Sequence, residues 1–315
     1  MTVSVVIPAH QSAWCLPDAL ASVAAQSYRD YEVIVVDDGS TDATAEVATS
    51  SCERLGIERV SLIRRAHGMG PSNAGIARNT GVEAAAGEYV AFLDADDVWY
   101  PQKLEKVMDV FSTAPSPLTG VCHAEAITEE GDVVRIQRYG GWARFLPLFW
   151  RLLLVDNCLS PSATVVEREA IRAAGGFSPD PRHHSVEDYD LWLRLARTGR
   201  IEFIDEPLGE YRHWPGGLSR DPALHLTSVL NVIDDNFRRV AGSRPGAWWR
   251  LLRRQRRMRA IRQMAWLCHR NRETREAMDL TLRASREWPI SPKLWAVAGI
   301  VAADAVRRSR TGHSA

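Results

Sequence analysis

Apolar residues in the first third of the chain fall in short runs that alternate with stretches of helical composition. The runs are β-branched and apolar almost throughout, which is typical of buried strands. Strands are predicted at residues 3–7, 32–36, 60–63 and 89–93, and helices between them at residues 16–25, 44–49 and 73–86. This alternation predicts an α/β fold, a doubly wound and mostly parallel sheet with helices on both faces. Ligands of such sheets gather at the carboxyl ends of the strands.

The alternation of predicted strands and helices becomes less regular after residue 100, and the pattern changes again after residue 220. Residues 103–111, 145–155 and 187–197 are predicted as helices, and strands are predicted around Val121, around Val134 and at 201–212. Beyond residue 221 apolar residues recur only at spacings of three and four, which indicates helices. We therefore expect a domain at residues 1–220 and a C-terminal α-helical appendage at residues 221–315.

Charge divides the chain at the same place. The 315 residues carry 39 basic and 39 acidic side chains, but residues 1–220 have a net charge of −11 and residues 221–315 one of +11. An acidic domain followed by an arginine-rich tail is typical of a tail that meets an anionic membrane or another acidic surface. The composition, with 45% hydrophobic and 25% charged residues, excludes a disordered or collagen-like chain.

The cysteines and the apolar stretches bear on the compartment. Five scattered cysteines without a CxxC pair indicate neither a zinc site nor a disulfide framework, so we expect a reducing cytoplasm. A secretory signal with a basic start is absent from the beginning of the sequence, and no run of about 18 apolar residues occurs. We expect a cytoplasmic protein without a membrane-spanning helix.

Two acidic motifs follow predicted strands. The run Asp37 to Asp42 (DDGSTD) follows the second strand, where a carboxylate can accept hydrogen bonds from a nucleobase or ribose and where Ser40 or Thr41 can cap a helix. Taken alone, this motif is equally typical of a turn that only caps a helix and binds no nucleotide. The run Leu93 to Asp97 (LDADD) follows the fourth strand, and its three carboxylates repel one another unless a cation neutralises them. Hard oxygen ligands of this kind suit Mg²⁺ or Mn²⁺ in a diphosphate site, in preference to an acidic surface turn.

Two further elements carry charged groups on helices. Arg78 lies on the predicted helix at residues 73–86 and can reach a phosphate, although a solvated helical arginine is equally common. Glu187 and Asp188 open another helix, whose positive end favours ionised carboxylates. Taken alone, this pair is more typical of an ordinary helix start on the surface.

In their order along the chain, these motifs strongly resemble glycosyltransferase family 2, the inverting nucleotide-sugar enzymes of the GT-A fold. The resemblance covers roughly residues 2–220. Its six pieces are VSVVIPAHQ at residues 3–11, DDGSTD at 37–42, NAGIARNTG at 73–81, LDADD at 93–97, SATVVEREAIRAAGGF at 162–177 and EDYDLWL at 187–193. Each piece is weak alone, whereas six in family order make a strong match.

The resemblance implies a role for each matching residue. Those expected to bind the nucleotide sugar are Pro8, Ala9, His10, Asp38, Arg78, Asp94, Ala95 and Asp96. Within this set Asp38 would hold the base, Asp94 would face the ribose, and Asp96 of the DXD pair would hold a Mn²⁺ or Mg²⁺ ion. Asp188 would be the catalytic base, with Glu187 on the acceptor side.

The chain departs from the family at two points. His10-Gln11 stands where many members have an aromatic-Asn pair, which leaves the base open. The family run Tyr-Arg-x-His reads Tyr211-Arg212-His213-Trp214, with the histidine displaced by one residue. His213 is therefore a candidate metal ligand, and a packed or capping histidine is an equal alternative. His183 and His184 are interpreted as loop residues at the acceptor entrance, which the loop at 157–162 also serves.

The expected function is metal-dependent, inverting transfer of a sugar from a nucleoside diphosphate sugar to an acceptor hydroxyl in polysaccharide or glycoconjugate assembly. A UDP-sugar is the first choice of donor, and a glycan or lipid-linked molecule is the expected acceptor. A non-catalytic nucleotide-sugar or glycan binding protein is the alternative, whereas an oxidoreductase is disfavoured because no GxGxxG follows the first strand.

Two interpretations of the tail remain open. One is a helical region packed on the acidic domain. The other is peripheral attachment to an anionic membrane, on its inner face, through the arginines between residues 250 and 262. Nucleic acid is not expected as a partner, because the acidic domain would repel it.

Overall fold

The computed structural model describes residues 1–66, 73–115, 118–138, 145–213, 222–242 and 246–311, without the side chains of residues 304–311. The chain forms two compact units. The first unit comprises Met1–Phe149, Cys158–Pro181 and Glu187–Gly217, and the second comprises Trp150–Asn157, Arg182–Val186 and Leu218–Ala315. The boundary predicted at residues 220–221 lies outside the described residues. Two short segments from the middle of the chain belong to the second unit, which the sequence does not indicate.

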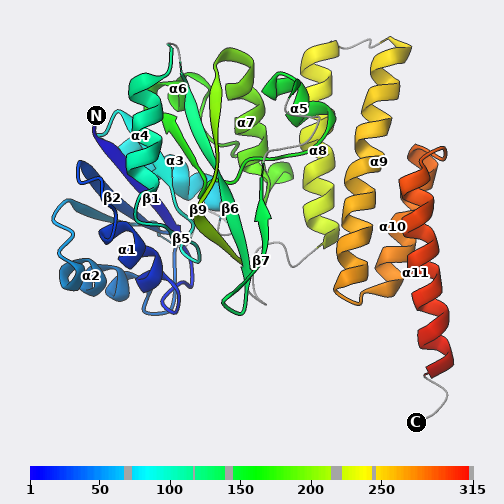
Figure 1. Ribbon diagram of the computed structural model, residues 1–315, viewed down its shortest axis with the longest axis horizontal. Helices are drawn as coiled ribbons and strands as arrows, with labels where there is room; N and C mark the ends of the chain where they lie inside the picture. The colour runs from blue at the N-terminus through cyan, green and yellow to red at the C-terminus, as the bar shows by residue number, and fades with distance from the viewer. Residues whose placement is uncertain (67–72, 116–117, 139–144, 214–221, 243–245, 312–315) are drawn as a thin grey trace. The chain divides into compact units, whose positions relative to one another are not determined.

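The N-terminal half of the first unit is a parallel sheet in the order β3-β2-β1-β4 (Figure 1). Its strands are β1 (Val3–Ala9), β2 (Tyr31–Asp37), β3 (Val60–Arg64) and β4 (Tyr89–Phe92), and its helices are α1 (Leu16–Ala24), α2 (Thr44–Leu55) and α3 (Ala74–Ala84). Strand β1 is buried on both faces. Val5 belongs to the core beneath α1, whereas Val6 faces Gly81 of α3, where no space remains for a Cβ atom.

The sheet continues with strands of mixed direction. In the order β4-β8-β6-β9-β5, the pairs β4–β8, β8–β6 and β9–β5 are antiparallel and β6–β9 is parallel, while β7 pairs antiparallel with β6. These strands are β5 (Val98–Trp99), β6 (Gly120–Glu129), β7 (Asp132–Gln137), β8 (Thr164–Glu167) and β9 (Ile201–His213). The predicted α/β class with helices on both faces is confirmed, although the sheet is more mixed than the mostly parallel sheet expected.

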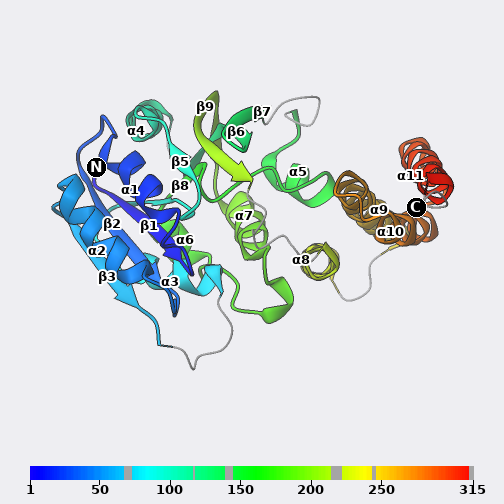
Figure 2. The same ribbon diagram turned by 90° about the horizontal axis from the view of Figure 1, so that it is seen from below.

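Helices cover both faces of this sheet (Figure 2). Helices α1, α2 and α4 (Lys103–Thr113) share one apolar core with β1, β2 and β4. Helices α3 and α7 (Glu187–Thr198) lie on the other face, where the ring of Phe177 contacts Phe92 of β4 at 5.1 Å and Trp192 of α7 at 6.2 Å. The short helix α6 (Arg168–Ala173) follows β8. The two helix layers hold the strand ends, and hence the loops that follow them, in fixed positions.

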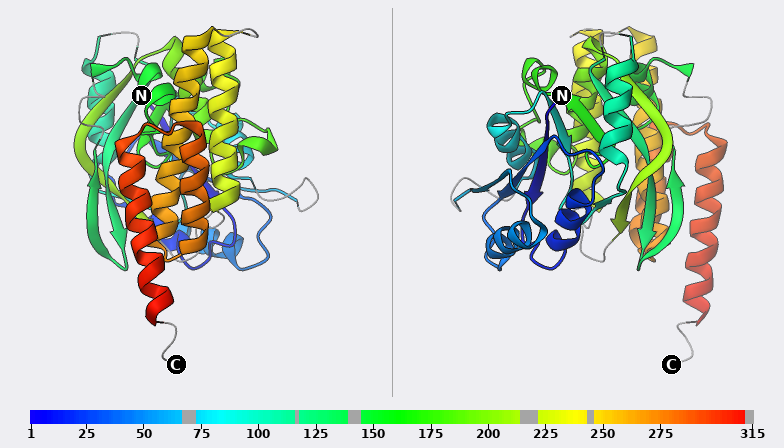
Figure 3. Two further views of the ribbon diagram at one scale, coloured as in Figure 1. Left: turned by 90° about the vertical axis from the view of Figure 1, so that its right-hand side faces the viewer. Right: turned by 60° about the vertical axis from the view of Figure 1, so that its left-hand side comes forward.

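The second unit is helical. It contains α8 (Pro222–Ala241), α9 (Ala247–Arg270), α10 (Thr274–Glu287) and α11 (Pro292–Thr311), and receives most of α5 (Leu148–Leu154). Helix α9 packs against both α8 and α10, and α11 packs against α10 and α9 (Figure 3). Trp249 packs its ring against Trp150 and Phe237. In the part of the chain that the structure describes, no helix is both long and apolar enough to cross a bilayer.

Candidate functional site

The loops after β1 and β2 are joined by hydrogen bonds. The Ser40 hydroxyl accepts from the Gln11 amide nitrogen at 3.0 Å, and Gln11 Nε2 donates to the Thr41 hydroxyl at 2.7 Å. Helix α2 begins only at Thr44, whose amide nitrogen donates to Asp42 at 3.1 Å. The prediction that Ser40 or Thr41 caps this helix is therefore wrong, because both side chains hold the two loops together instead.

Asp38, the residue expected to hold the base, is buried where these loops meet. Its carboxylate accepts from the Asn73 amide nitrogen at 2.7 Å and pairs with Arg65 at the end of β3. Its carbonyl oxygen lies 3.0 Å from Nδ1 of His10. Ala9 pairs with Asp37 in the β1–β2 register, and Pro8 precedes it on β1. The residues expected to line the base pocket thus lie beside one another at the carboxyl ends of β1 and β2.

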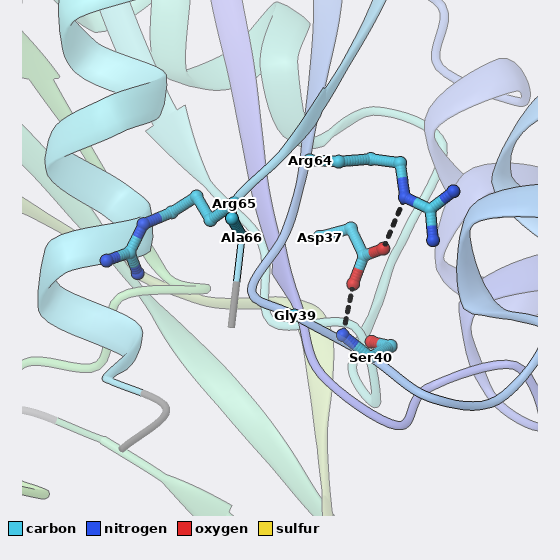
Figure 4. Close-up of a pocket in the computed structure, with 6 residues that line it drawn as sticks. All are labelled: Asp37, Gly39, Ser40, Arg64, Arg65 and Ala66. Carbon is cyan, nitrogen blue, oxygen red and sulfur yellow. Dashed lines mark hydrogen bonds and ion pairs between the residues drawn. The ribbon is translucent and has the colours of Figure 1, made fainter. Parts of the chain in front are cut away.

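A cavity of about 290 Å³ opens next to these loops (Figure 4). Its walls are formed by Asp37, Gly39, Ser40, Arg64, Arg65 and Ala66. Asp37 accepts from the Ser40 amide nitrogen at 2.9 Å and lies 3.4 Å from Nε of Arg64, which fixes the turn. Gly39 adopts a φ of 73°, a conformation that strains other L-residues. Arg64 lies beside Asp37 in this cavity, whereas the guanidinium of Arg65 points away from it toward its partner Asp38 (Figure 4).

Arg78 joins Asp94, expected on the donor side, to Glu187, expected on the acceptor side. It is 4% exposed, donates to Asp94 at 2.6 Å and to Glu187 at 2.9 Å, and lies 5.5 Å above the Phe177 ring. Gly75 makes this junction possible, because a Cβ atom there would lie 2.5 Å from Cγ of Glu187. The two carboxylates keep the pKa of Arg78 above its usual value despite burial. Its charge is therefore permanent, and Asp94 and Glu187 lie within reach of one guanidinium.

Hydrogen bonds with Ser162 and Arg212 hold the acidic turn after β4 in place. Asp97 is 1% exposed and accepts from the Ser162 hydroxyl at 2.5 Å and from the Arg212 amide nitrogen at 3.0 Å. The Ser162 hydroxyl also accepts from the Asp94 amide nitrogen at 3.1 Å, and Arg212 Nε donates to the Asp96 carbonyl oxygen at 2.5 Å. Ser162 and Arg212 therefore fix the backbone that carries Asp94, Ala95 and Asp96.

The proton affinity of the acidic turn is raised. Burial and the neighbouring Asp94 raise the pKa of Asp96 to about 6, while Arg212 and Arg78 act in the opposite direction. Burial also raises the pKa of Asp97 well above its usual range. Carboxylates that resist ionisation together are stabilised as anions by a nearby dication. The donor set of hard oxygens therefore fits Mg²⁺ or Mn²⁺, with Asp96 as the residue that would hold it.

A second buried polar cluster lies behind this turn. Glu125 of β6 accepts from the Ser160 hydroxyl at 2.9 Å, and burial raises its pKa to about 7. Lys103 is fully buried, with Nζ 3.5 Å from the centre of the Trp99 ring. The Trp99 indole nitrogen donates to the Ser162 carbonyl oxygen at 2.8 Å. This cluster supports the loop that carries Ser162 and thereby the acidic turn.

Asp188 lies at the start of α7 beside Glu187 and within the field of Arg78. Burial and the charge of Glu187 raise its pKa to about 7, and Arg78 opposes this shift. The positive end of the helix was expected to favour the ionised carboxylate. Burial and the charge of Glu187 oppose this effect, and the pKa of Asp188 is raised and not lowered. A carboxylate with a pKa near neutrality is suited to accept a proton at physiological pH.

The predicted histidines have different surroundings. His213 is the last residue of β9, is exposed, and lies with its ring centre 5.2 Å from that of Tyr211. It follows Arg212, which binds the acidic turn. His183, by contrast, is 2% exposed, belongs to the second unit, and lies 3.1 Å from Asp235 of α8. The interpretation of His183 as an entrance residue is not supported by this burial. His184 next to it is only partly buried.

Several residues of this site have no signal in the sequence. Arg65, Ser162 and Arg212 contact the acidic residues from 27 to 115 positions away along the chain. No helical or strand period connects such distant positions, and a single serine or arginine has no distinctive spacing. The SATVV motif at residues 162–166 and the Tyr-Arg-His run at 211–213 contain two of them.

Comparison with known proteins identifies the family. Residues 4–171 match the model of Glycosyl transferase family 2. TuaG of Bacillus subtilis, a putative teichuronic acid biosynthesis glycosyltransferase, is 39% identical over 226 residues, which cover 67% of this chain and 78% of TuaG. Across the first six curated relatives, the chain spans between 38% and 68% of their length.

Two solved structures share the fold. S. aureus TarS 1–349 in complex with UDP-GlcNAc has a TM-score of 0.63 at 16% identity, covering 94% of this chain and 84% of that chain. The mannosyltransferase PcManGT from Pyrobaculum calidifontis, in complex with GDP-Man and Mn²⁺, has a TM-score of 0.61 at 18% identity, covering 96% and 80%. Together with the family match over more than half of its length, these similarities mean that the chain belongs to glycosyl transferase family 2.

Proposed function

We propose that this protein is an inverting glycosyltransferase that transfers a sugar from a nucleoside diphosphate sugar to an acceptor hydroxyl. The observation that carries the proposal is the bridge from Asp94 through Arg78 to Glu187, which brings the donor-side turn and the acid pair to one place. A nucleotide-binding turn beside a carboxylate with a pKa of about 7 is the arrangement that such a transfer needs. Residues 1–220 are the proposed catalytic domain.

In the proposed donor site, Pro8, Ala9 and His10 line the base pocket and Asp38 holds the base. Arg78 lies near the diphosphate, and Asp94 faces the ribose. A divalent cation, Mn²⁺ or Mg²⁺, held by Asp96 with His213 as a second ligand, would neutralise charge on the diphosphate. The complexes of the two similar structures with UDP-GlcNAc and GDP-Man support a nucleotide sugar as donor, and a UDP-sugar is our first choice.

The proposed reaction is a single displacement. The acceptor oxygen forms a bond to the anomeric carbon while the bond from that carbon to the diphosphate oxygen breaks, which inverts the configuration. Asp188 takes the proton of the acceptor hydroxyl, and the electron pair of the broken bond leaves with the nucleoside diphosphate. Glu187 keeps Arg78 in place on the acceptor side. Because only the ionised carboxylate can accept a proton, the rate should rise with pH up to about 7 and then level off.

The wider context follows from the relatives. The name of TuaG supports a role in polysaccharide or glycoconjugate assembly. The proposed acceptor is a glycan or a lipid-linked molecule. The basic residues of the C-terminal region, 19 against 8 acidic ones, support peripheral attachment to the inner face of an anionic membrane. We place the protein in the cytoplasm and propose no nucleic-acid partner.

A donor screen tests the proposed function. Purified protein is incubated with UDP- and GDP-sugars and Mn²⁺ or Mg²⁺, and release of free sugar and nucleotide is measured. We expect one donor to be hydrolysed slowly, and Asp188→Asn to lower this turnover about 10²-fold or more while nucleotide affinity stays nearly unchanged. Asp109→Asn, an exposed acid on α4, is the matched control and should leave the rate unchanged. Nucleotide-sugar binding without any turnover would instead favour the non-catalytic alternative.

A further inference from the structure

Helix α11 has two apolar faces, of which only one is packed. Leu294, Val297 and Val301 are buried against α10 and α9. At 100° per residue these three positions fall within one arc of the helix. The opposite arc is exposed and consists of Trp295, Ala296, Gly299, Ile300, Ala302 and Ala303, which we call the α11 outer face.

The α11 outer face is unusually apolar for a surface. Trp295 is 55% exposed and Ile300 is 46% exposed, and Ile290 in the turn before the helix is 73% exposed. Lys293 is the single charged residue between positions 288 and 303, and it lies at the edge of the exposed arc. Exposed large apolar side chains in a contiguous group mark an interaction surface, whereas single ones do not.

The indole N–H group of Trp295 already has a hydrogen-bond partner within the protein. Its Nε1 donates to the Pro289 carbonyl oxygen at 2.6 Å, so the ring can leave water without losing a hydrogen bond for its N–H group. Buried polar groups without a partner are costly in lipid, and this contact removes that cost. Tryptophan is also the residue most typical of the boundary between lipid and water.

Some of the arginines of α9, in contrast, are used inside the helical unit. Arg257 pairs with Asp234 at 2.6 Å and with Glu287 at 3.0 Å. Arg256 is 3% exposed, and Arg254 donates to the Arg286 carbonyl oxygen at 3.1 Å. Arg257 and Arg254 thus connect α9 with α8 and α10. A membrane contact that engaged these two arginines would cost these bonds.

We propose that the α11 outer face is the surface through which this protein docks on an anionic lipid bilayer. The inference rests on the proposed membrane attachment and moves it from α9 to α11. Residues 221–315 have a net charge of +11, and the last turns of α11 contain Arg307, Arg308 and Arg310 against one acid, Asp304. Lys293 and the basic last turns of α11 complement anionic lipid, whereas the same basic positions of a second copy repel them. An interfacial helix with Trp and Ile toward the acyl boundary fits these features.

Vesicle co-sedimentation of the full chain tests the proposal. The vesicles contain phosphatidylcholine alone or phosphatidylcholine with 30% phosphatidylglycerol as the probe, at about 50 and about 500 mM salt, where screening differs strongly. We expect binding to the anionic vesicles at low salt only. The double variant Trp295→Ser/Ile300→Ser should lower the partition coefficient about tenfold or more. The matched control is Trp266→Ser, which removes an exposed tryptophan of α9 and should bind like the parent.

Three measurements separate the outcomes. Circular dichroism melting should show that the variants are as stable as the parent, since both side chains are exposed. If parent and double variant bind anionic vesicles equally, the α11 outer face is not the docking surface, although membrane attachment stands. If sedimentation equilibrium gives a parent dimer that the double variant loses, the face binds a second copy and the proposal is overturned. Donor hydrolysis in solution without vesicles should be unchanged in the double variant, so the proposed catalytic function is judged separately.

Discussion

Replacing Arg78 with methionine tests the central bridge of the first unit. The substitution keeps most of the side-chain volume but removes the guanidinium that contacts Asp94 at 2.6 Å and Glu187 at 2.9 Å. The Glu187 side chain is only 7% exposed, so water cannot replace the lost partner. Removing one member of a buried ion pair typically costs about 3–5 kcal/mol, because an uncompensated charge stays behind. We expect the free energy of unfolding to fall by this amount at pH 7.5.

The cost should depend on pH in a defined direction. Without Arg78, the carboxylates of Glu187 and Asp188 lose the positive charge that lowers the pKa of Asp188. Asp188 should therefore take up its proton at higher pH than in the parent, and this protonation relieves part of the uncompensated charge. The stability deficit of Arg78→Met should accordingly shrink as pH falls from about 7.5 to about 5.5.

Urea denaturation followed by circular dichroism measures this deficit. Arg172→Met is the matched control, because Arg172 also pairs with a glutamate at 2.9 Å but is 44% exposed with an exposed partner. Such surface pairs contribute about 0–1 kcal/mol, so the control should change little. Adding Glu187→Gln to Arg78→Met should restore part of the loss. A deficit below about 1 kcal/mol that does not vary with pH would refute the assignment of Arg78 as the charge that stabilises these acids.

Three further predictions concern the acidic groups. Asp96→Ala should abolish the effect of Mn²⁺ on UDP affinity in titration calorimetry, and unchanged metal dependence would remove Asp96 as the ligand. Ser162→Ala should cost about 1–3 kcal/mol of stability by leaving buried Asp97 short of a donor, and should raise the donor KM, whereas exposed Ser112→Ala should do neither. Asp188 has a folded pKa of about 7 against 3.8 for the free group, so the folded state binds more protons, and stability should fall as pH rises from about 4 to about 7 and level off above. Asp188→Asn should flatten part of that decline, and a parallel curve would argue against the raised pKa.

The strand and helix pattern of the first unit was accessible from sequence wherever an element is long and buried. Strand β1 was predicted at residues 3–7 and spans Val3–Ala9, and α7 was predicted at 187–197 and spans Glu187–Thr198. Strand β5 has two residues, which is too short for a periodic signal, and β8 (TVVE) has only two apolar residues between polar ones. Both pair only with strands that lie far away in sequence. The antiparallel half of the sheet was therefore incompletely predicted.

Buried ionisable residues were the hardest to foresee. Lys103 opens α4 and reads as an ordinary first-turn lysine, yet it is fully buried against Trp99. Glu125 lies in a predicted strand, and the sequence pattern of that strand does not indicate that its acid is buried. In the structure, burial raises the pKa of Glu125 to about 7. Such residues are tolerated because partners from distant segments surround them, and a local pattern cannot contain that information.

The acid pair at α7 illustrates how environment decides what a motif can do. From sequence, Glu187 and Asp188 occupy the positive end of a helix, and this position alone favours two anions. In the folded chain Glu187 is neutralised by Arg78, while Asp188 is left with burial and a neighbouring negative charge, both of which raise its pKa. Burial and the neighbouring charge, and not the helix end alone, thus set the proton affinity of Asp188. Asp188 is therefore suited to exchange a proton near pH 7, while Glu187 holds Arg78 in place.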